Sequence, residues 1–296
     1  MKNVAGSGGK WLDVSAERFP RWIASFSVRH GVSGAAEASL ADGAAGRDND
    51  DMGPEQALDV PGVALAVTFG DDHVSFTALD GSIAECHPPF PPARGVATIT
   101  GLATLMEGAG LADSVTPGEV AEALAAHARR PRTVGVLLVR LGGYAAGVFT
   151  GYPPALQEAK VGSRLVHGRS AAGGWSQHRF ARRREKQANE ALDAAADAAV
   201  MIFGKQIATV RSKSQITARS GEASAGRRPQ PTATGLDAVV LGGDRRAVAE
   251  LRDDPRLAPY FKLAAERFLT VPDPKRAVLL ETPRLFTAVR IRLTET

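Results

Sequence analysis

The stretch Gly168-Arg-Ser-Ala-Ala-Gly-Gly-Trp-Ser-Gln-His-Arg-Phe-Ala-Arg-Arg-Arg-Glu-Lys-Gln187 is the most informative part of this chain. Its two adjacent glycines, Gly173 and Gly174, predict a flexible turn, because glycine adopts backbone angles that other residues avoid. The turn presents a polar tip, Ser176-Gln177, and a strongly basic helix start follows at once. A small polar loop on a cationic stem indicates a site that works against a phosphate-rich partner.

The composition is that of a globular protein with a mild excess of positive charge. The chain has 296 residues, a formal net charge of +4 and a sequence pI of about 9.4. The length predicts two domains, and the basic balance favours an anionic partner. Cys86 is the only cysteine, which excludes an internal disulfide and disfavours a cysteine-based zinc site. No apolar run suits a signal peptide or a membrane span, so we expect a cytoplasmic protein.

The first 130 residues predict a small α+β domain. Apolar residues at helical spacing predict a helix from Ser15 to His30. Two β-rich runs, Val63–Phe69 and Val74–Leu79, are split by a Gly-Asp-Asp sequence and predict a hairpin. Thr116-Pro117-Gly118-Glu119 predicts the start of a helix that ends near Arg129. Residues 31–56 are rich in Ala, Gly and Asp and predict a disordered linker.

Residues 131–296 predict a second domain. Val134–Leu141 and Tyr144–Phe149 flank a Gly-Gly turn and predict a hairpin, and Glu158–Val166 predicts a third strand. A long helix follows the Gly173-Gly174 tip. Its apolar stripe comprises Ala181, Ala188, Leu192, Ala195, Ala199 and Ile202.

The end of the chain predicts further strands and one mobile segment. Leu236–Leu241 predicts a buried strand that turns through Gly242-Gly243-Asp244 into a helix at about 245–252. This turn could be a phosphate loop, but it lacks the Lys-Ser/Thr ending, so a turn capped by Asp244 is favoured. Val278–Leu280 and Phe286–Leu293 predict two more strands, and residues 213–235 predict a mobile segment.

The charges on the long helix are placed against its dipole. Arg179, Arg182, Arg183 and Lys186 lie near the predicted amino-terminal end, where the helix dipole disfavours cations. A choice that costs the helix stability indicates that these charges serve a partner.

The run Gly173–Lys186 resembles the catalytic loop and following helix of eukaryotic-type class I peptide release factors. In that family a Gly-Gly-Gln tip precedes Ser, an Arg-Phe-Ala-Arg stretch and a basic helix. The run is more similar still to the actinobacterial Vms-like peptidyl-tRNA hydrolases, relatives of the eukaryotic Vms/ankyrin-repeat zinc-finger ribosome-rescue factors. The Val134–Phe149 hairpin, the lead-in Lys160-Val-Gly-Ser-Arg-Leu-Val166 and Gly168-Arg169 carry the same resemblance. It covers about Pro131 to Asp273.

The resemblance implies a fold and an activity. The fold is α/β (α+β), with an RNase H-like, release-factor-type catalytic domain at residues 131–296 and a smaller domain at residues 1–130. The activity is that of a peptidyl-tRNA hydrolase in ribosome rescue and ribosome-associated quality control. It needs no cofactor and no metal. The implied partners are peptidyl-tRNA and the large ribosomal subunit with its RNA, bound by a monomer without a membrane.

The resemblance also implies which residues act. Trp175 follows Gly-Gly directly, where release factors have glutamine, and Gln177 comes two residues later. The Vms-like relatives also place their glutamine after an intervening residue, so Gln177 is the predicted catalytic residue, with Gly173, Gly174 and Ser176 around it. An ester between peptide and tRNA is already activated, so positioning a water and stabilising the oxyanion suffice. The predicted RNA-binding residues are Arg164, Arg169, Trp175, His178, Arg179, Arg182, Arg183 and Lys186.

Several alternatives stay open. Trp175 either stacks on a base or anchors the loop through a hydrophobic contact. A Ser176–His178 nucleophile–base pair is disfavoured, because neighbouring side chains diverge and no carboxylate to orient the histidine is evident. The whole chain could instead be an endonuclease that removes the tRNA 3′ end, or a non-catalytic ribosome- or RNA-binding factor. A metal-dependent RNase H-type nuclease is least favoured, since the catalytic half lacks a convincing set of carboxylates.

Overall fold

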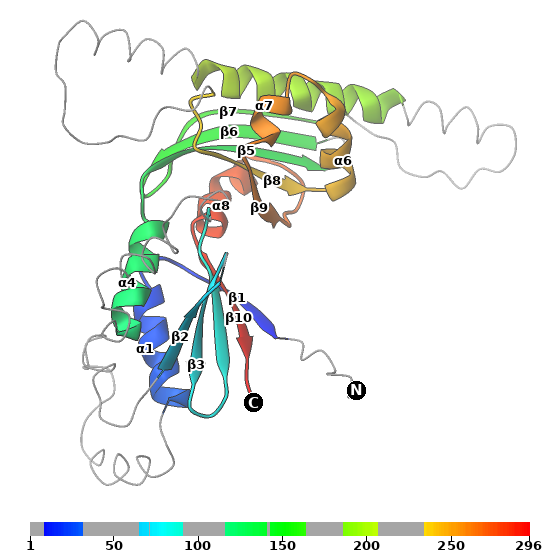
Figure 1. Cartoon of the computed structure of the whole chain (residues 1–296). Coiled ribbons are helices and arrows are strands. Elements are labelled where there is room, and N and C mark those ends of the chain that lie inside the picture. Colours follow the sequence, from blue (N-terminus) through cyan, green and yellow to red (C-terminus); the bar gives the residue numbers. More distant parts are fainter. Residues whose placement is uncertain are drawn as a thin grey trace, which may run out of the picture. The chain divides into compact units, whose positions relative to one another are not determined.

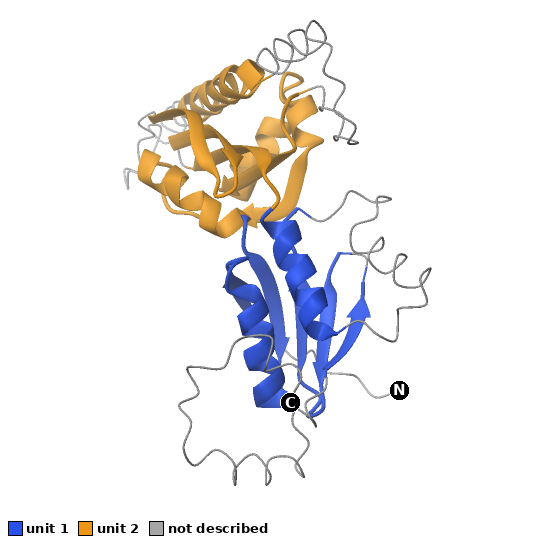
Figure 2. Cartoon of the chain, turned by 90° about the vertical axis from the view of Figure 1, so that its left-hand side faces the viewer, with its two compact units in different colours: residues 1–129, 287–296 blue, residues 130–286 orange. Residues whose placement is uncertain are grey.

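The structure is a computed structural model that describes residues 9–31, 65–70, 72–90, 116–140, 143–163, 186–206 and 234–296. It divides into two compact units (Figure 2). The first contains residues 1–129 and 287–296, and the second contains residues 130–286. The predicted linker at 31–56 and the predicted mobile segment at 213–235 fall almost wholly outside the described residues.

The first unit is an antiparallel sheet with two helices. The strand order is β1 (Lys10–Val14), β10 (Val289–Thr294), β4 (Ile83–His87), β3 (Val74–Ala78), β2 (Leu65–Phe69). Every second residue of β3 and β10 is buried, as expected of a sheet with one covered face. Helices α1 (Phe19–His30) and α4 (Pro117–Ala128) pack against each other and supply the other side of the core (Figure 2).

The hairpin and the two helices predicted for this unit are confirmed. The β2–β3 hairpin forms, α1 ends at the predicted residue, and it begins four residues later than predicted. At the start of α4, the Thr116 hydroxyl accepts from the backbone N–H of Glu119 at 3.2 Å. In return, the backbone N–H of Thr116 donates to the Glu119 carboxylate at 2.8 Å. This capping box satisfies two N–H groups that a helix start otherwise leaves unpaired.

We predicted that the end of the chain belongs to the second domain, at residues 131–296. The structure shows that it does not. Strand β10 lies between β1 and β4, with Ile291 opposite both Leu12 and Cys86, so it completes the sheet of the first unit. The reason is its alternation: Val289, Ile291 and Leu293 are buried together on the helix-covered face. A local pattern predicts a strand but not the sheet that receives it.

The second unit is a five-stranded mixed sheet with the order β7-β6-β5-β8-β9. The predicted hairpin is confirmed by β5 (Arg132–Arg140) and β6 (Gly143–Gly151), and β7 (Ala155–Ser163) completes an antiparallel meander. Strands β8 (Ala238–Gly243) and β9 (Ala264–Leu269) run parallel to β5. An antiparallel meander extended by two parallel strands is the topology of RNase H-like α/β domains.

Helices cover both faces of this sheet (Figure 1). Helix 186–206, α6 (Arg245–Glu250) and α7 (Ala258–Phe261) pack with Leu137 and Val139 of β5 on one face. On the other face, α8 (Arg276–Phe286) approaches β6 so closely that a Cβ on Gly147 would lie 2.9 Å from Leu279 Cδ2. The continuous apolar run of β5 follows from this two-sided burial.

The strand that we predicted at Val278–Leu280 is wrong, because these residues lie inside α8. Leu279, Thr282 and Phe286 are buried at spacings of three and four, whereas Leu280 is 49% exposed. The helical period therefore decides the structure over the short apolar run. The predicted third strand forms as β7 but lies three residues earlier than Glu158–Val166.

Candidate functional site

The predicted reactive loop lies between the edge strand β7 and the long helix of the second unit. Strand β7 ends at Ser163, the described part of the long helix covers residues 186–206, and residues 164–185 lie between the two in the chain. Lys186 is the one predicted site residue in the described part, and it is exposed in the first described turn of the helix. The others lie outside the described residues: Arg164, Arg169, Gly173, Gly174, Trp175, Ser176, Gln177, His178, Arg179, Arg182 and Arg183.

The helix after the loop is anchored by its apolar stripe. Ala195, Ala199 and Ile202 are 1% exposed or less, which confirms that part of the predicted stripe. They pack in one cluster with side chains of β5, β6 and β8, and Phe203 meets Tyr260 edge-on at 5.2 Å between ring centroids. Because turning the helix would expose these side chains, the sheet fixes where the loop rejoins the domain.

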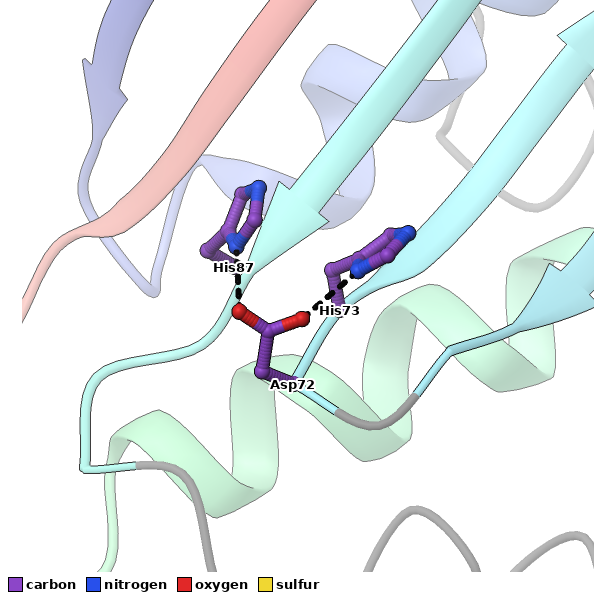
Figure 3. A group of neighbouring side chains, drawn as sticks. All are labelled: Asp72, His73 and His87. Atoms are coloured by element: carbon purple, nitrogen blue, oxygen red, sulfur yellow. Dashed lines mark hydrogen bonds and ion pairs between the residues drawn. The ribbon is translucent and has the colours of Figure 1, made fainter.

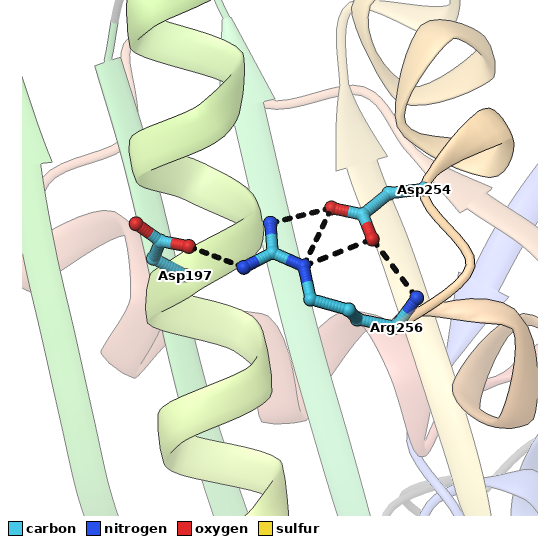
Figure 4. A network of polar contacts seen from close by, with 3 residues as sticks. All are labelled: Asp197, Asp254 and Arg256. Atoms are coloured by element: carbon cyan, nitrogen blue, oxygen red, sulfur yellow. Dashed lines mark hydrogen bonds and ion pairs between the residues drawn. The ribbon is translucent and has the colours of Figure 1, made fainter.

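A polar network holds the outer side of the same helix (Figure 4). Arg256, which follows η1 (Leu251–Asp253), donates through Nη1 to Asp197 Oδ1 of the helix at 2.7 Å. It also donates through Nη2 to Asp254 Oδ2 at 2.6 Å. Further along, Lys205 of the helix forms an ion pair with Glu158 of β7. The helix is thus tied both to β7 and to the segment before α7.

We expect an Arg256→Gln variant to lose a pH-dependent part of the stability. The hydrogen bond from Arg256 holds the pKa of the Asp254 carboxyl below its ordinary value. Such a group stabilises the fold above its unfolded-state pKa, and this is lost as the pH falls through the folded-state pKa. Urea unfolding should therefore show a wild-type free energy that falls below about pH 5, and a variant that falls less steeply.

The matched control for this prediction is Arg246→Gln. Arg246 is also an exposed arginine in an ion pair, but its partner, Glu250 at 3.4 Å, lies in the same helix α6. At neutral pH, both substitutions should lower the free energy of unfolding only modestly, because exposed ion pairs contribute little. If the free energy of unfolding falls equally steeply with pH in the wild type and in Arg256→Gln, the role assigned to this arginine is contradicted.

The last residues before the loop pack against a tyrosine. Gly162 of β7 lies opposite Tyr144 of β6, and a Cβ on Gly162 would lie 2.5 Å from the tyrosine hydroxyl oxygen. The absence of a side chain at Gly162 lets the ring lie over the strand. This explains why glycine suits the lead-in Lys160-Val-Gly-Ser-Arg-Leu-Val166.

The Gly242-Gly243-Asp244 turn is a strand-to-helix connection, as favoured above. The backbone N–H of Asp244 donates to Val139 O at 2.8 Å, and that of Arg246 donates to Asp244 Oδ1 at 2.8 Å. These two N–H groups are therefore already bonded within the protein. The predicted cap by Asp244 is confirmed.

Comparison with known proteins places the chain in the class of release-factor-like proteins. Residues 132–292 match the family described as "Actinobacteria/chloroflexi VLRF1 release factor". The match spans more than half of the chain, and the chain belongs to this family. The matched residues include the whole connection from β7 to the long helix, and with it the predicted catalytic loop.

One solved structure and one absence complete the comparison. The chain is similar to a solved structure described as "Crystal structure of archaeal translation termination factor, aRF1". The identity is 11% and the TM-score 0.31, over 96% of this chain and 68% of that chain. No curated protein matches the chain. In the part of the chain that the structure describes, no helix is long and apolar enough to cross a membrane.

Proposed function

We propose that this protein is a peptidyl-tRNA hydrolase that releases nascent peptides from tRNA on stalled ribosomal complexes, with the large subunit as its platform. The observation that carries the proposal is the family match over residues 132–292. It spans the Gly173-Gly174 tip and Gln177, in the connection from β7 to helix 186–206. The proposed site thus lies in a connection between two elements of the second unit, and catalytic residues commonly lie in such connections.

The proposed chemistry is ester hydrolysis without a titrating catalytic group. The Gln177 amide, or its backbone N–H, orients a water and stabilises the oxyanion of the tetrahedral intermediate. Gly173 and Gly174 let the backbone approach the tRNA 3′ end closely. The loop needs no cofactor in this scheme, because positioning and a preorganised donor supply the acceleration.

The proposed RNA contact is the basic stem that follows the tip. Arg179, Arg182, Arg183 and Lys186 would neutralise phosphates of tRNA and ribosomal RNA, together with Arg164 and Arg169. Their number implies binding that weakens steeply with salt, because each neutralised phosphate releases counterions. The exposed position of Lys186 supports this assignment. Trp175 and His178 complete the proposed surface, and we expect the protein to act in the cytoplasm as a monomer.

The deciding experiment follows both products of one reaction. Purified large subunits that carry a labelled nascent chain on tRNA are incubated with the full chain, and peptide release and tRNA size are measured together. We expect free peptide and full-length tRNA that can be recharged. Shortened tRNA would instead support removal of the tRNA 3′ end. Binding to the subunits without turnover would support a non-catalytic binding factor.

A further inference from the structure

Three side chains with metal-binding atoms meet at one end of the sheet in the first unit (Figure 3). Asp72 and His73 lie in the hairpin turn directly before β3, and His87 is the last residue of β4. Strands β3 and β4 are antiparallel, with Val74 opposite Cys86, so the start of β3 and the end of β4 coincide. The sheet register therefore brings the three residues together.

The distances suit a single small cation. The Asp72 carboxylate lies between the two rings, with Oδ1 2.8 Å from His73 Nδ1 and Oδ2 3.6 Å from His87 Nδ1. One ligand atom from each of the three residues lies within 4.8 Å of the others. Tetrahedral ligands at about 2.0–2.1 Å from zinc stand roughly 3.3 Å apart. Small side-chain movements would therefore place all three around one ion.

Packing holds both rings in place. A Cβ on Gly70 would lie 2.5 Å from His73 Cε1, so the backbone of the hairpin lies directly against that ring. The His87 ring lies 5.4 Å from that of Trp11 and 5.1 Å from that of His73, between centroids. His87 Nε2 is buried and has no hydrogen-bond partner among the described residues. The other ring nitrogen, Nδ1, is the one that faces Asp72.

The charge states also suit a metal. Burial, as the largest cause, lowers the pKa of His87, and the neutral ring is the form that coordinates. The hydrogen bond with His73 lowers the pKa of Asp72. Arg290, opposite His87 in the sheet, opposes a cation, but its guanidinium lies over the Trp11 ring at 4.3 Å from the centroid.

We propose that Asp72, His73 and His87 form a binding site for one divalent transition-metal ion, best matched by Zn²⁺. Two imidazoles and one carboxylate are a common zinc donor set, and a water would complete the tetrahedron. The ion would link the β2–β3 hairpin to the end of β4. The site lies in the first unit and is independent of the proposed peptidyl-tRNA hydrolysis, so the two proposals fail separately.

The test uses the full chain, stripped of metal with a chelator. Titration with Zn²⁺ by calorimetry and with Co²⁺ by visible absorption should show binding, and Zn²⁺ should raise the melting temperature. His73→Gln, His87→Gln and Asp72→Asn should each weaken this binding about tenfold or more. Circular dichroism establishes whether each variant is folded. If His87→Gln does not fold, the two turn variants, Asp72→Asn and His73→Gln, suffice for the test.

The matched control is His30→Gln. His30 also hydrogen-bonds an aspartate of the first unit, with Nδ1 2.8 Å from Asp80 Oδ2, but it lies outside the cluster. This variant should bind Zn²⁺ like wild type. Absence of Zn²⁺ binding by the wild type would overturn the site and leave Asp72 as a carboxylate that is hydrogen-bonded to His73 and close to His87. Unchanged binding in all three cluster variants would also overturn it.

Discussion

The Gln177→Ala variant is expected to release nascent peptide from tRNA about 100- to 1,000-fold more slowly than the wild type, as when an oxyanion donor is removed. The change deletes the amide that would orient water and stabilise the developing charge, and leaves the basic stem intact. The loss should therefore appear in the single-turnover rate rather than in affinity for the ribosomal complex. Rates are measured on purified stalled complexes at saturating protein.

The matched control is Gln157→Ala. Gln157 is an exposed glutamine on β7, in the same unit, and its side chain donates to Ala155 O at 3.2 Å. Its replacement should leave peptide release unchanged. A wild-type rate in Gln177→Ala would remove the Gln177 side chain from the proposed mechanism.

The Ser176→Ala variant separates this mechanism from a nucleophilic one. With a catalytic glutamine, loss of the serine hydroxyl should cost far less than loss of Gln177. If Ser176→Ala abolishes release while Gln177→Ala preserves it, the Ser176–His178 pair would be supported instead.

Local signals predicted most individual elements of the fold. The capping sequence at Thr116 and the apolar stripe of helix 186–206 depend on neighbouring residues and their periodicity, and both are confirmed. Strands β1, β4 and β9 were not predicted. β4, for example, mixes Glu85 and His87 with two buried positions, so its apolar alternation is too short to stand out.

The sequence did not predict which distant residues and strands pair with one another. Arg256 and Asp197 are 59 residues apart, and no spacing rule joins them. The same holds for β10, which pairs with strands more than 200 positions earlier in the chain. His73 and His87 were likewise not predicted as a pair, because only the register of β3 and β4 brings them together. The candidate catalytic loop differs, because its proposed chemistry could be predicted from consecutive residues.

The Gly243→Ala variant is expected to destabilise the second unit by about 2–5 kcal/mol, from backbone strain and overpacking together. Gly243 ends β8 with φ +100°, an angle that side chains with a Cβ rarely adopt. An added Cβ would lie 2.1 Å from Val139 O, the atom that accepts from the backbone N–H of Asp244. Relief of this clash would require β5 and β8 to separate, or the Asp244 cap to move.

A loss of that size is a large share of the about 5–15 kcal/mol that stabilises a typical domain. It should be visible as a lower urea midpoint or as insoluble protein. The matched control is Gly204→Ala in helix 186–206, where the nearest atom to an added Cβ, Tyr260 Oη, lies at 3.8 Å. There alanine should be neutral or stabilise by up to about 1 kcal/mol, because it favours the helix. Opposite signs for the same substitution would show that the turn after β8 demands glycine for its backbone; wild-type stability of Gly243→Ala would refute that requirement.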